Sequence, residues 1–465
     1  MSPYQSILLQ NATLIVPKGH GDDHVIPLKN HALLIEGNRI ARIASHIDPP
    51  SQSTEVIDCS AKIISPGFVD THHHVWQTQL KGRHADHSLL EYMVPGNMAS
   101  HSYKPEDVFW GQLGGCLEAL EAGTTTIVDH AHILYTPEHN NAALSATISS
   151  GIRSIYCYCP IGRVKTWKPI EVEEELLPAW LFEQLTSLCK NGPFANGRVT
   201  MGFAFDSFYL PNDVVVSIFN QVRGLVIKTI TSHYVQAFSR VGASIPSTPD
   251  TELQMGHGWP VCFQDNAKLI SSLGIDCHSN NTGSIVAQMK VGLQAERARR
   301  NDRIHEAGKI PAKVQVSAQD AFQLGTVGGA RAIKMSDQIG SLEEGKIADL
   351  VIWDTLSPAM ICAAEEDPIA AIILHSAQSD IDAVIVDGQF RKRNGQLVTT
   401  KLDLELMPDL KHEKSGVQWR DVATELLKSR HGILEREKAS GADDREAGFE
   451  NIVRIFGTDK DRLVY

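Results

Sequence analysis

The chain has little of what would draw it to nucleic acid or to a membrane. Its 465 residues carry a formal net charge of −12, and the Lys and Arg residues form no stripe, so nucleic acid is not an expected partner. No apolar run approaches the roughly 20 residues that a membrane-spanning helix needs. Residues 1–5 lack the basic and then apolar pattern of a signal peptide. We therefore expect a cytoplasmic protein, away from membranes, that acts on a small molecule.

Cysteine is sparse as well, and it forms no recognisable pattern. The eight cysteines are scattered, and the nearest pair, Cys157 and Cys159, is expected on one strand. None has the spacing of a zinc finger, and no disulfide framework is indicated. Reduced, mostly buried thiols are the expectation.

What the chain does have is a middle of alternating strands and helices between two β-rich ends. The sequence Glu36-Gly37-Asn38-Arg39 between apolar runs is a hairpin signal near the N-terminus. From residue 61 onward the alternation is typical of parallel βα units. The middle is predicted to hold strands at 62–72, 124–129, 153–159, 198–206, 226–233, 243–247 and 273–276, and helices near 105–122, 137–149, 171–190, 211–222, 261–271, 283–300 and 317–334. The ends are predicted to hold strands at 6–16, 32–36, 39–44, 55–58, 346–353 and 383–386, and a helix near 422–428.

The predicted fold class is α/β, with a TIM-like (β/α) barrel over residues 61–339. An open, doubly wound sheet would require a Gly-rich phosphate-binding turn after its first strand, and histidines stand there instead. Residues 1–60 and 340–400 are each too poor in strands to bury an apolar face, so we expect one composite β-sandwich from both. Residues 401–465 are predicted to be a charged, peripheral C-terminal tail.

Polar residues stand where the predicted barrel strands end. The active site of such a barrel lies at the C-terminal ends of its strands, so these positions are candidates for function. They are His72, His74, His130, His132, Asp206, His233 and Asp276.

His72 and His74 form the clearest metal signal. Residues i and i+2 of a strand point to one face, so both imidazoles can bind one ion while His73 points away. A polar loop is the alternative for such a His-rich strand end. With His233 and Asp276 the pair makes a set of three nitrogens and one oxygen, which suits one divalent ion, zinc in preference to iron.

The chemistry expected of this set is attack by water. A divalent ion lowers the pKa of its bound water, and Asp276 is predicted to accept the released proton. Taken singly, Asp276 would be interpreted as a turn residue after Leu273-Gly274-Ile275, and His233 would be equally consistent with a structural strand-end histidine. Gln77 and Glu252 are candidate substrate-binding residues, with loop packing and a solvated carboxylate as their respective alternatives.

At this point the chain resembles the amidohydrolase superfamily, in the branch of cytosine and guanine deaminases and triazine chlorohydrolases. The resemblance spans residues 5–400 and is carried by the segments 66–74 (PGFVDTHHH), 121–125 (EAGTT), 232–233 (SH), 273–276 (LGID) and 345–350 (GKIADL). It implies a TIM-like barrel with one metal ion and a small β-sandwich from both chain ends. It also implies hydrolysis of non-peptide C–N bonds of cyclic amidines or related heterocycles. The strand at 198–206 holds no lysine, which speaks against members that bridge two metals with a modified lysine there.

Two departures from the family pattern follow the predicted fifth strand. The family usually has a proton-shuttling Glu three residues after its histidine, whereas this chain has Gln236 at that position. Gln236 is therefore expected only to orient the substrate through hydrogen bonds. Moreover, only residues 234–243 separate His233 from the next predicted strand, too few for a parallel crossover. The barrel is therefore expected to lack one βα unit and the histidine on it. His257 is a candidate replacement, although it lies in a Gly-rich loop.

Two functions therefore stand side by side. The first is a hydrolase of non-peptide C–N bonds, with Asp276 and His233 as catalytic residues and Gln77, Gln236 and Glu252 as substrate-binding residues. The second is a shortened, catalytically impaired product that keeps the metal ligands. The sequence leaves open whether the chain forms a homo-oligomer.

Overall fold

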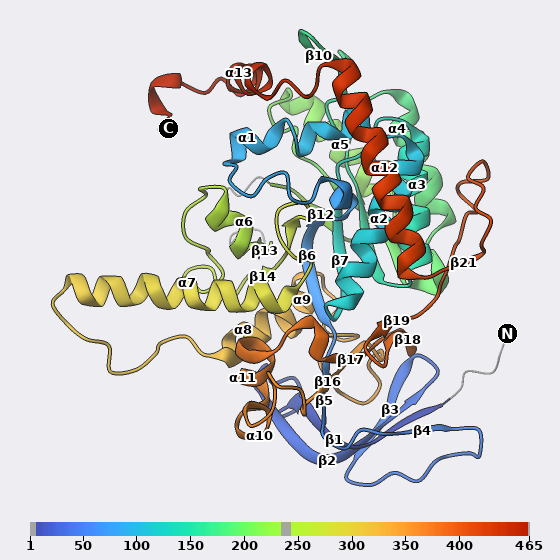
Figure 1. Cartoon of the computed structure of the whole chain (residues 1–465), viewed down its shortest axis with the longest axis vertical. Coiled ribbons are helices and arrows are strands. Elements are labelled where there is room, and N and C mark those ends of the chain that lie inside the picture. The colour runs from blue at the N-terminus through green and yellow to red at the C-terminus, as the bar shows by residue number, and fades with distance from the viewer. Residues whose placement is uncertain (1–5, 234–242, 464–465) are drawn as a thin grey trace.

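The computed structural model describes residues 6–233 and 243–463, which form two main sheets, and most of the helices lie around one of them (Figure 1). One sheet has nine strands in the order β19-β18-β17-β16-β5-β1-β2-β3, with β4 beside β1. Its strands are β1 (Ile7–Pro17), β2 (Val25–Glu36), β3 (Arg39–Ala44), β4 (Glu55–Asp58), β5 (Lys62–Pro66), β16 (Leu350–Asp354), β17 (Ile381–Val386), β18 (Gln389–Arg393) and β19 (Gln396–Leu397). Strands from both ends of the chain thus lie in one sheet.

The second sheet is a parallel half-barrel of six strands in the order β12-β11-β8-β7-β6-β15. Its strands are β6 (Phe68–His74), β7 (Thr124–Ala131), β8 (Arg153–Tyr158), β11 (Val199–Ala204), β12 (Ile230–Thr231) and β15 (Asp276–Cys277). A separate parallel pair, β13 (Ile245–Ser247) and β14 (Ser271–Leu273), leads into β15. The predicted parallel βα architecture is confirmed, but the six-stranded sheet does not close into a barrel within the described residues.

The helices follow the predicted alternation. The α-helices of five residues or more are α1 (Leu89–Met93), α2 (Pro105–Glu121), α3 (Pro137–Ser150), α4 (Ala179–Asn191), α5 (Asn212–Arg223), α6 (Pro249–Gln254), α7 (Ile285–Glu306), α8 (Ala318–Gly325), α9 (Val327–Ala332), α12 (Trp419–Ser440) and α13 (Arg445–Ile455). The short elements are α10 (Ala363–Glu366), α11 (Pro368–Ala370) and the strands β9 (Val164–Trp167), β10 (Ile170–Val172), β20 (Thr400–Lys401) and β21 (Gly416–Val417). Tight turns include η1 (Val75–Leu80), directly after β6. No helix among the described residues is long and apolar enough to cross a membrane.

The predicted strand 62–72 is two strands that belong to different sheets. The break falls at Gly67, whose N–H donates to the carbonyl of Asp349 at 2.9 Å, while the next N–H, of Phe68, donates to Gly123. A Cβ at Gly67 would lie 2.2 Å from the Thr125 hydroxyl oxygen, so only glycine fits at this crossing. Sequence periodicity runs through the break because both strands are buried.

Three helix predictions need correction. No helix forms at 261–271, where isolated turns close on Val261 and Gln264 instead. The helix predicted at 171–190 begins only at Ala179, after Pro178, because the preceding segment forms the β9–β10 hairpin. The helix predicted at 317–334 is interrupted at Thr326, whose backbone is not helical and whose hydroxyl donates to the Phe322 carbonyl.

Strand β16 connects the two halves of the molecule. Its side chains alternate, as strand geometry requires. Leu350 and Ile352 pack in the core of the nine-stranded sheet, while Val351 and Trp353 pack in the larger core beside Phe68. The Trp353 and Phe68 rings meet edge to face at 6.1 Å. The nine-stranded sheet therefore backs directly onto the strand that carries His72 and His74.

Helix α12 is much longer than the predicted segment 422–428, because its buried stripe continues. Val422, Leu426, Ser429, Ile433 and Glu437 recur at spacings of three and four and are buried. The helix runs along α2 (Figure 1), where Arg436 forms an ion pair with Asp107. Arg430 donates to the carbonyl oxygens of Gln79 and Lys81. This part of the C-terminal segment therefore supports η1, next to the histidine strand.

We predict that Ile433→Ala lowers the free energy of unfolding by about 2–5 kcal/mol, because it removes a fully buried side chain and leaves a cavity. The matched control is Leu434→Ala on the same helix, where the wild-type side chain is 42% exposed and little change is expected. Chemical denaturation of the full chain measures both. Equal losses in the two variants would show that α12 does not pack as described.

Candidate metal centre

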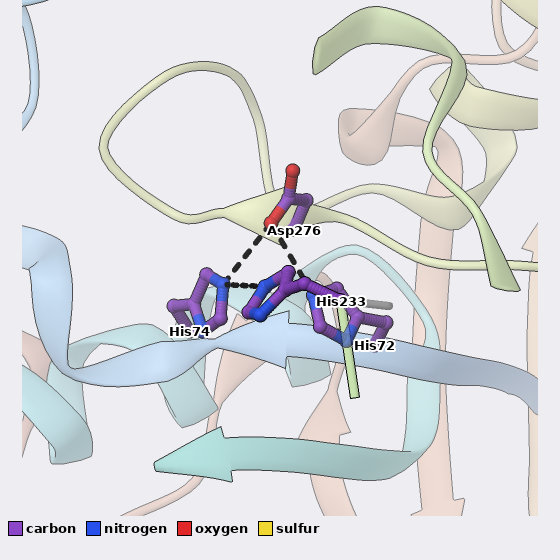
Figure 2. A group of neighbouring side chains, drawn as sticks. All are labelled: His72, His74, His233 and Asp276. Carbon is purple, nitrogen blue, oxygen red and sulfur yellow. Dashed lines mark hydrogen bonds and ion pairs between the residues drawn. The ribbon is translucent and has the colours of Figure 1, made fainter. Parts of the chain in front are cut away.

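Four predicted residues meet at one end of the half-barrel (Figure 2). His72 and His74 extend from the same face of β6, and His233 stands two residues after β12. Asp276 begins β15, which pairs in parallel with β6 so that Asp276 lies opposite His73. The structure thus brings together residues that are up to 204 positions apart in the chain, as the strand-end argument anticipated.

The donor atoms of the four side chains all lie within 4.8 Å of one another. His74 Nε2 is 3.2 Å from His233 Nε2 and 3.1 Å from Asp276 Oδ1. His72 Nε2 is 3.3 Å from the same carboxylate oxygen. Three imidazoles and one carboxylate at these separations are a donor set that suits zinc.

The partners of two imidazoles fix which nitrogen faces the cluster. His74 Nδ1 lies 2.9 Å from the carbonyl oxygen of His130, which only accepts, so Nδ1 carries the proton. His233 Nδ1 lies 2.9 Å from the Asp206 carboxylate and donates for the same reason. The lone pairs of both Nε2 atoms therefore point toward each other, an arrangement that needs a cation or a proton between them. The residues present fit a divalent ion.

The local electrostatics agree with this arrangement. Burial lowers the pKa of His74 to about 3, which keeps the ring neutral and able to bind an ion. Burial acts against ionisation of Asp276, yet the polar contacts with the His72 and His74 rings hold the pKa of its carboxyl well below the usual range. Burial likewise opposes charge on His233, but the Asp206 carboxylate raises the pKa of this imidazole overall. The cluster thus contains a fixed negative charge and attracts positive charge.

Backbone geometry also aims Asp276 at the histidines. Its φ is +66°, a left-handed conformation that non-glycine residues adopt at a cost, and such strain is typical of functional sites. Just before it, a Cβ at Gly274 would lie 2.7 Å from the carbonyl oxygen of His72. Because Gly274 has no side chain, this segment can approach β6. The predicted strand 273–276 is split for this reason.

One side of the centre is accessible to solvent. The His72 and His74 side chains are 6% and 3% exposed, whereas that of His233 is 43% exposed. Among the described residues, the cluster is therefore least covered on the His233 side.

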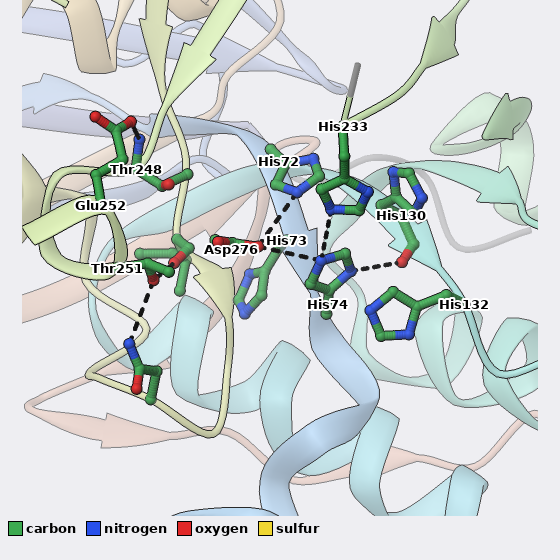
Figure 3. A network of polar contacts seen from close by, with 12 residues as sticks. His72, His73, His74, His130, His132, His233, Thr248, Thr251, Glu252 and Asp276 are labelled. Atoms are coloured by element: carbon green, nitrogen blue, oxygen red, sulfur yellow. Dashed lines mark hydrogen bonds and ion pairs between the residues drawn. The ribbon is translucent and has the colours of Figure 1, made fainter. Parts of the chain in front are cut away.

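The candidate substrate-binding residues have partners within the protein. Gln77 donates to the Tyr92 hydroxyl at 2.6 Å and accepts from the Ser279 hydroxyl at 3.1 Å. Figure 3 shows Glu252 turned toward Thr248, whose N–H donates to its carboxylate at 2.6 Å. In these contacts both side chains organise loops around the centre. Gln236 lies outside the described residues.

A buried polar chain beside the centre was not foreseen from the sequence. His73, predicted only to point away, lies 2.7 Å from Asp70 and 2.9 Å from His278. His278 in turn lies 3.2 Å from Glu118, which pairs with Lys81. His278 stands just beyond β15, and no local sequence signal singled it out. The chain of contacts ties β6 to β15 and α2.

Histidines 130 and 132 also surround the cluster (Figure 3). The His132 ring lies against that of His74, with centroids 3.8 Å apart and ring planes tilted by 41°, and it accepts a hydrogen bond from Trp76. The His130 ring lies 4.4 Å from that of His233. Both were identified as strand-end residues, and both restrict how the predicted ligands can turn.

The chain is similar to known proteins along most of its length. The model of the amidohydrolase family matches residues 63–205 and 242–391, more than half of the chain. The 5'-deoxyadenosine deaminase of Methanocaldococcus jannaschii is 24% identical over 414 residues, covering 80% of this chain and 93% of that protein. The 5-methylthioadenosine/S-adenosylhomocysteine deaminase of Carboxydothermus hydrogenoformans is 27% identical over 449 residues, covering 86% and 95%.

Solved structures share the fold. A zinc-bound adenosine deaminase from Xanthomonas campestris superposes with a TM-score of 0.67 at 18% identity, covering 93% of this chain and 99% of that one. A zinc complex of atrazine chlorohydrolase from Arthrobacter aurescens reaches 0.70 at 17% identity, covering 91% and 100%. The predicted class, a metal-dependent hydrolase of non-peptide C–N bonds, is confirmed, and the catalytically impaired alternative is not favoured. The chain belongs to the amidohydrolase family.

Proposed function

We propose that His72, His74, His233 and Asp276 bind one zinc ion and that the chain removes an amino group hydrolytically from a purine nucleoside or a related heterocycle. The observation that carries the proposal is the pair of Nε2 lone pairs, of His74 and His233, that face each other at 3.2 Å. The nucleoside class is supported by the deaminases that align over four fifths of the chain or more.

Within this proposal each residue has a task. A bound divalent ion supplies a water whose pKa is lowered toward neutrality. Asp276 would be the acceptor for the proton of the attacking water. His233 contributes its Nε2 as a ligand while Asp206 holds its ring. Gln77, Gln236 and Glu252 are the proposed substrate contacts, and burial raises the pKa of the Glu252 carboxyl.

The leaving group distinguishes two substrate types. An amino group must be protonated to depart, and the amide of Gln236 cannot donate a proton as a carboxylic acid does. Chloride departs without protonation. Gln236 therefore favours, as a second candidate, hydrolysis of a chloro-substituted heterocycle, and chlorohydrolases are among the proteins that share the fold.

We predict that binding depends on the histidine strand and not on the Gly-rich loop. His74→Ala removes a ligand and should lower the zinc content of the purified chain by one equivalent relative to wild type. His257→Ala, an exposed histidine in that loop, is the control and should leave the content unchanged. Elemental analysis after dialysis measures both. Full retention by His74→Ala, or an equal loss with His257→Ala, would contradict the proposed ligand set.

We also predict opposite responses of two substrates to Gln236→Glu. The new carboxyl group restores an acid–base step, so turnover of a 6-aminopurine nucleoside should rise by about 10²–10⁴-fold. Turnover of the 6-chloro analogue should change little, since its leaving group needs no proton. Steady-state rates with both nucleosides provide the comparison. An unchanged amino-to-chloro ratio would refute the role given to residue 236.

We further propose that the barrel lacks one βα unit after His233. Supporting this, β12 pairs only with β11 and β13 only with β14 among the described residues, and the chain between His233 and Ser244 is short for a crossover. Closure would require an added strand. Inserting a strand–helix segment between Gln236 and Ser244 should therefore raise the melting temperature. An unchanged melting temperature would count against the missing unit.

The remaining proposals concern the domain organisation, the cellular location and the oligomeric state. We propose that residues 1–60 and 340–400 act as one β-sandwich domain, supported by their shared sheet, and that 401–465 form a separate C-terminal element. A cytoplasmic location and a homo-oligomeric state stay predictions; fractionation of cells and light scattering of the purified chain test them.

A further inference from the structure

A second cluster of metal-binding side chains lies beside the first. His130 is near the end of β7, Cys159 follows β8 directly, and Asp206 stands two residues after β11. These three strands are neighbours in the half-barrel, in the order β11-β8-β7. Three potential ligands therefore reach one edge of the sheet from adjacent strands. Their donor atoms all lie within 4.8 Å of one another.

The separations resemble those between ligands around one ion. His130 Nε2 lies 2.9 Å from Asp206 Oδ2 and 3.4 Å from Cys159 Sγ. Ligands at about 2.0–2.3 Å from a tetrahedral zinc ion lie roughly 3.3–3.8 Å apart. A widening of a few tenths of an ångström would thus admit an ion without moving any strand.

Burial and charge suit a cation at this place. His130 and Cys159 are 0% and 1% exposed, while the Asp206 side chain is 32% exposed and leaves a path to solvent. Burial lowers the pKa of His130 to about 3, so the ring is a neutral ligand. Burial also raises the pKa of the Cys159 thiol well above its ordinary value, so a thiolate there needs a cation beside it.

We propose that His130, Cys159 and Asp206 form a second binding site for a divalent ion, with water completing the shell. The thiolate favours zinc over magnesium or calcium. Binding releases the Cys159 proton to solvent, and the ion takes its place on sulfur. His130 Nε2, which donates to Asp206 in the absence of an ion, becomes free to bind when the ring proton moves to Nδ1. This proposal is independent of the nucleoside reaction proposed above.

The second site has a direct link to the first. Asp206 Oδ1 accepts from the His233 backbone N–H at 2.8 Å, and Oδ2 accepts from His233 Nδ1. An ion on Asp206 would therefore fix the residue that orients His233. Its role would be to position a ligand of the first centre.

Cobalt(II) separates the two sites optically. The first cluster has no sulfur donor, so a near-ultraviolet thiolate-to-cobalt charge-transfer band reports the second site alone. Titrating the metal-free full-length chain with cobalt should show two equivalents bound and this band. Cys159→Ser should lose the band and one equivalent, whereas Asp276→Asn should lose one equivalent and keep the band.

The matched control is Cys157→Ser, which changes a buried cysteine of β8 that lies outside the cluster. It should retain the band and both equivalents. Saturation at one equivalent without a band, or a band that survives Cys159→Ser, would overturn the proposal. If Cys159→Ser does not fold, X-ray absorption of the wild-type chain with two equivalents of zinc decides, and a spectrum without a sulfur ligand overturns it.

Discussion

The structure depends on holding two imidazole nitrogens close together with their lone pairs convergent. His74 and His233 come from strands at different places in the half-barrel, and their Nε2 atoms lie 3.2 Å apart. Each ring is locked by an acceptor on its other nitrogen, the His130 carbonyl for one and the Asp206 carboxylate for the other. Neutral rings in this arrangement repel each other. The fold maintains it because the surrounding contacts are numerous and buried, which is how proteins pre-organise metal sites.

Much of the remaining fold holds β6 in place. On one side, Phe68 at its start packs on Trp353 of the nine-stranded sheet. On another, His73 joins β6 through His278 to Glu118 on α2. Beyond the end of the strand, α12 supports η1 through Arg430. Elements that are far from β6 in the sequence thus hold the same seven residues, 68–74, in position.

The sequence was most informative where a short-range rule sufficed. The period of two placed His72 and His74 on one face, and the strand-end rule anticipated His233 and Asp276 beside them. Prediction from the sequence failed where the local structure depends on packing between segments that are far apart in the chain. The division at Gly67 arises from contact with Thr125 and Asp349, and the absent helix at 261–271 reflects local turns that periodicity does not distinguish from helix.

The same limit explains the residues that were missed. Cys159 was treated only as a buried thiol, although it follows a strand just as the candidate histidines do. Its nearness to His130 and Asp206 appears only once the order of β7, β8 and β11 is known. His278 required the register of β15 against β6, which no local pattern encodes.

The most direct test of the central claim is the position of zinc in crystals grown with one equivalent of the ion. Anomalous diffraction at the zinc edge should place a single peak between His72, His74, His233 and Asp276, with nitrogen ligands at about 2.0–2.1 Å. A peak elsewhere, or one that contacts fewer than three of these side chains, would contradict the account.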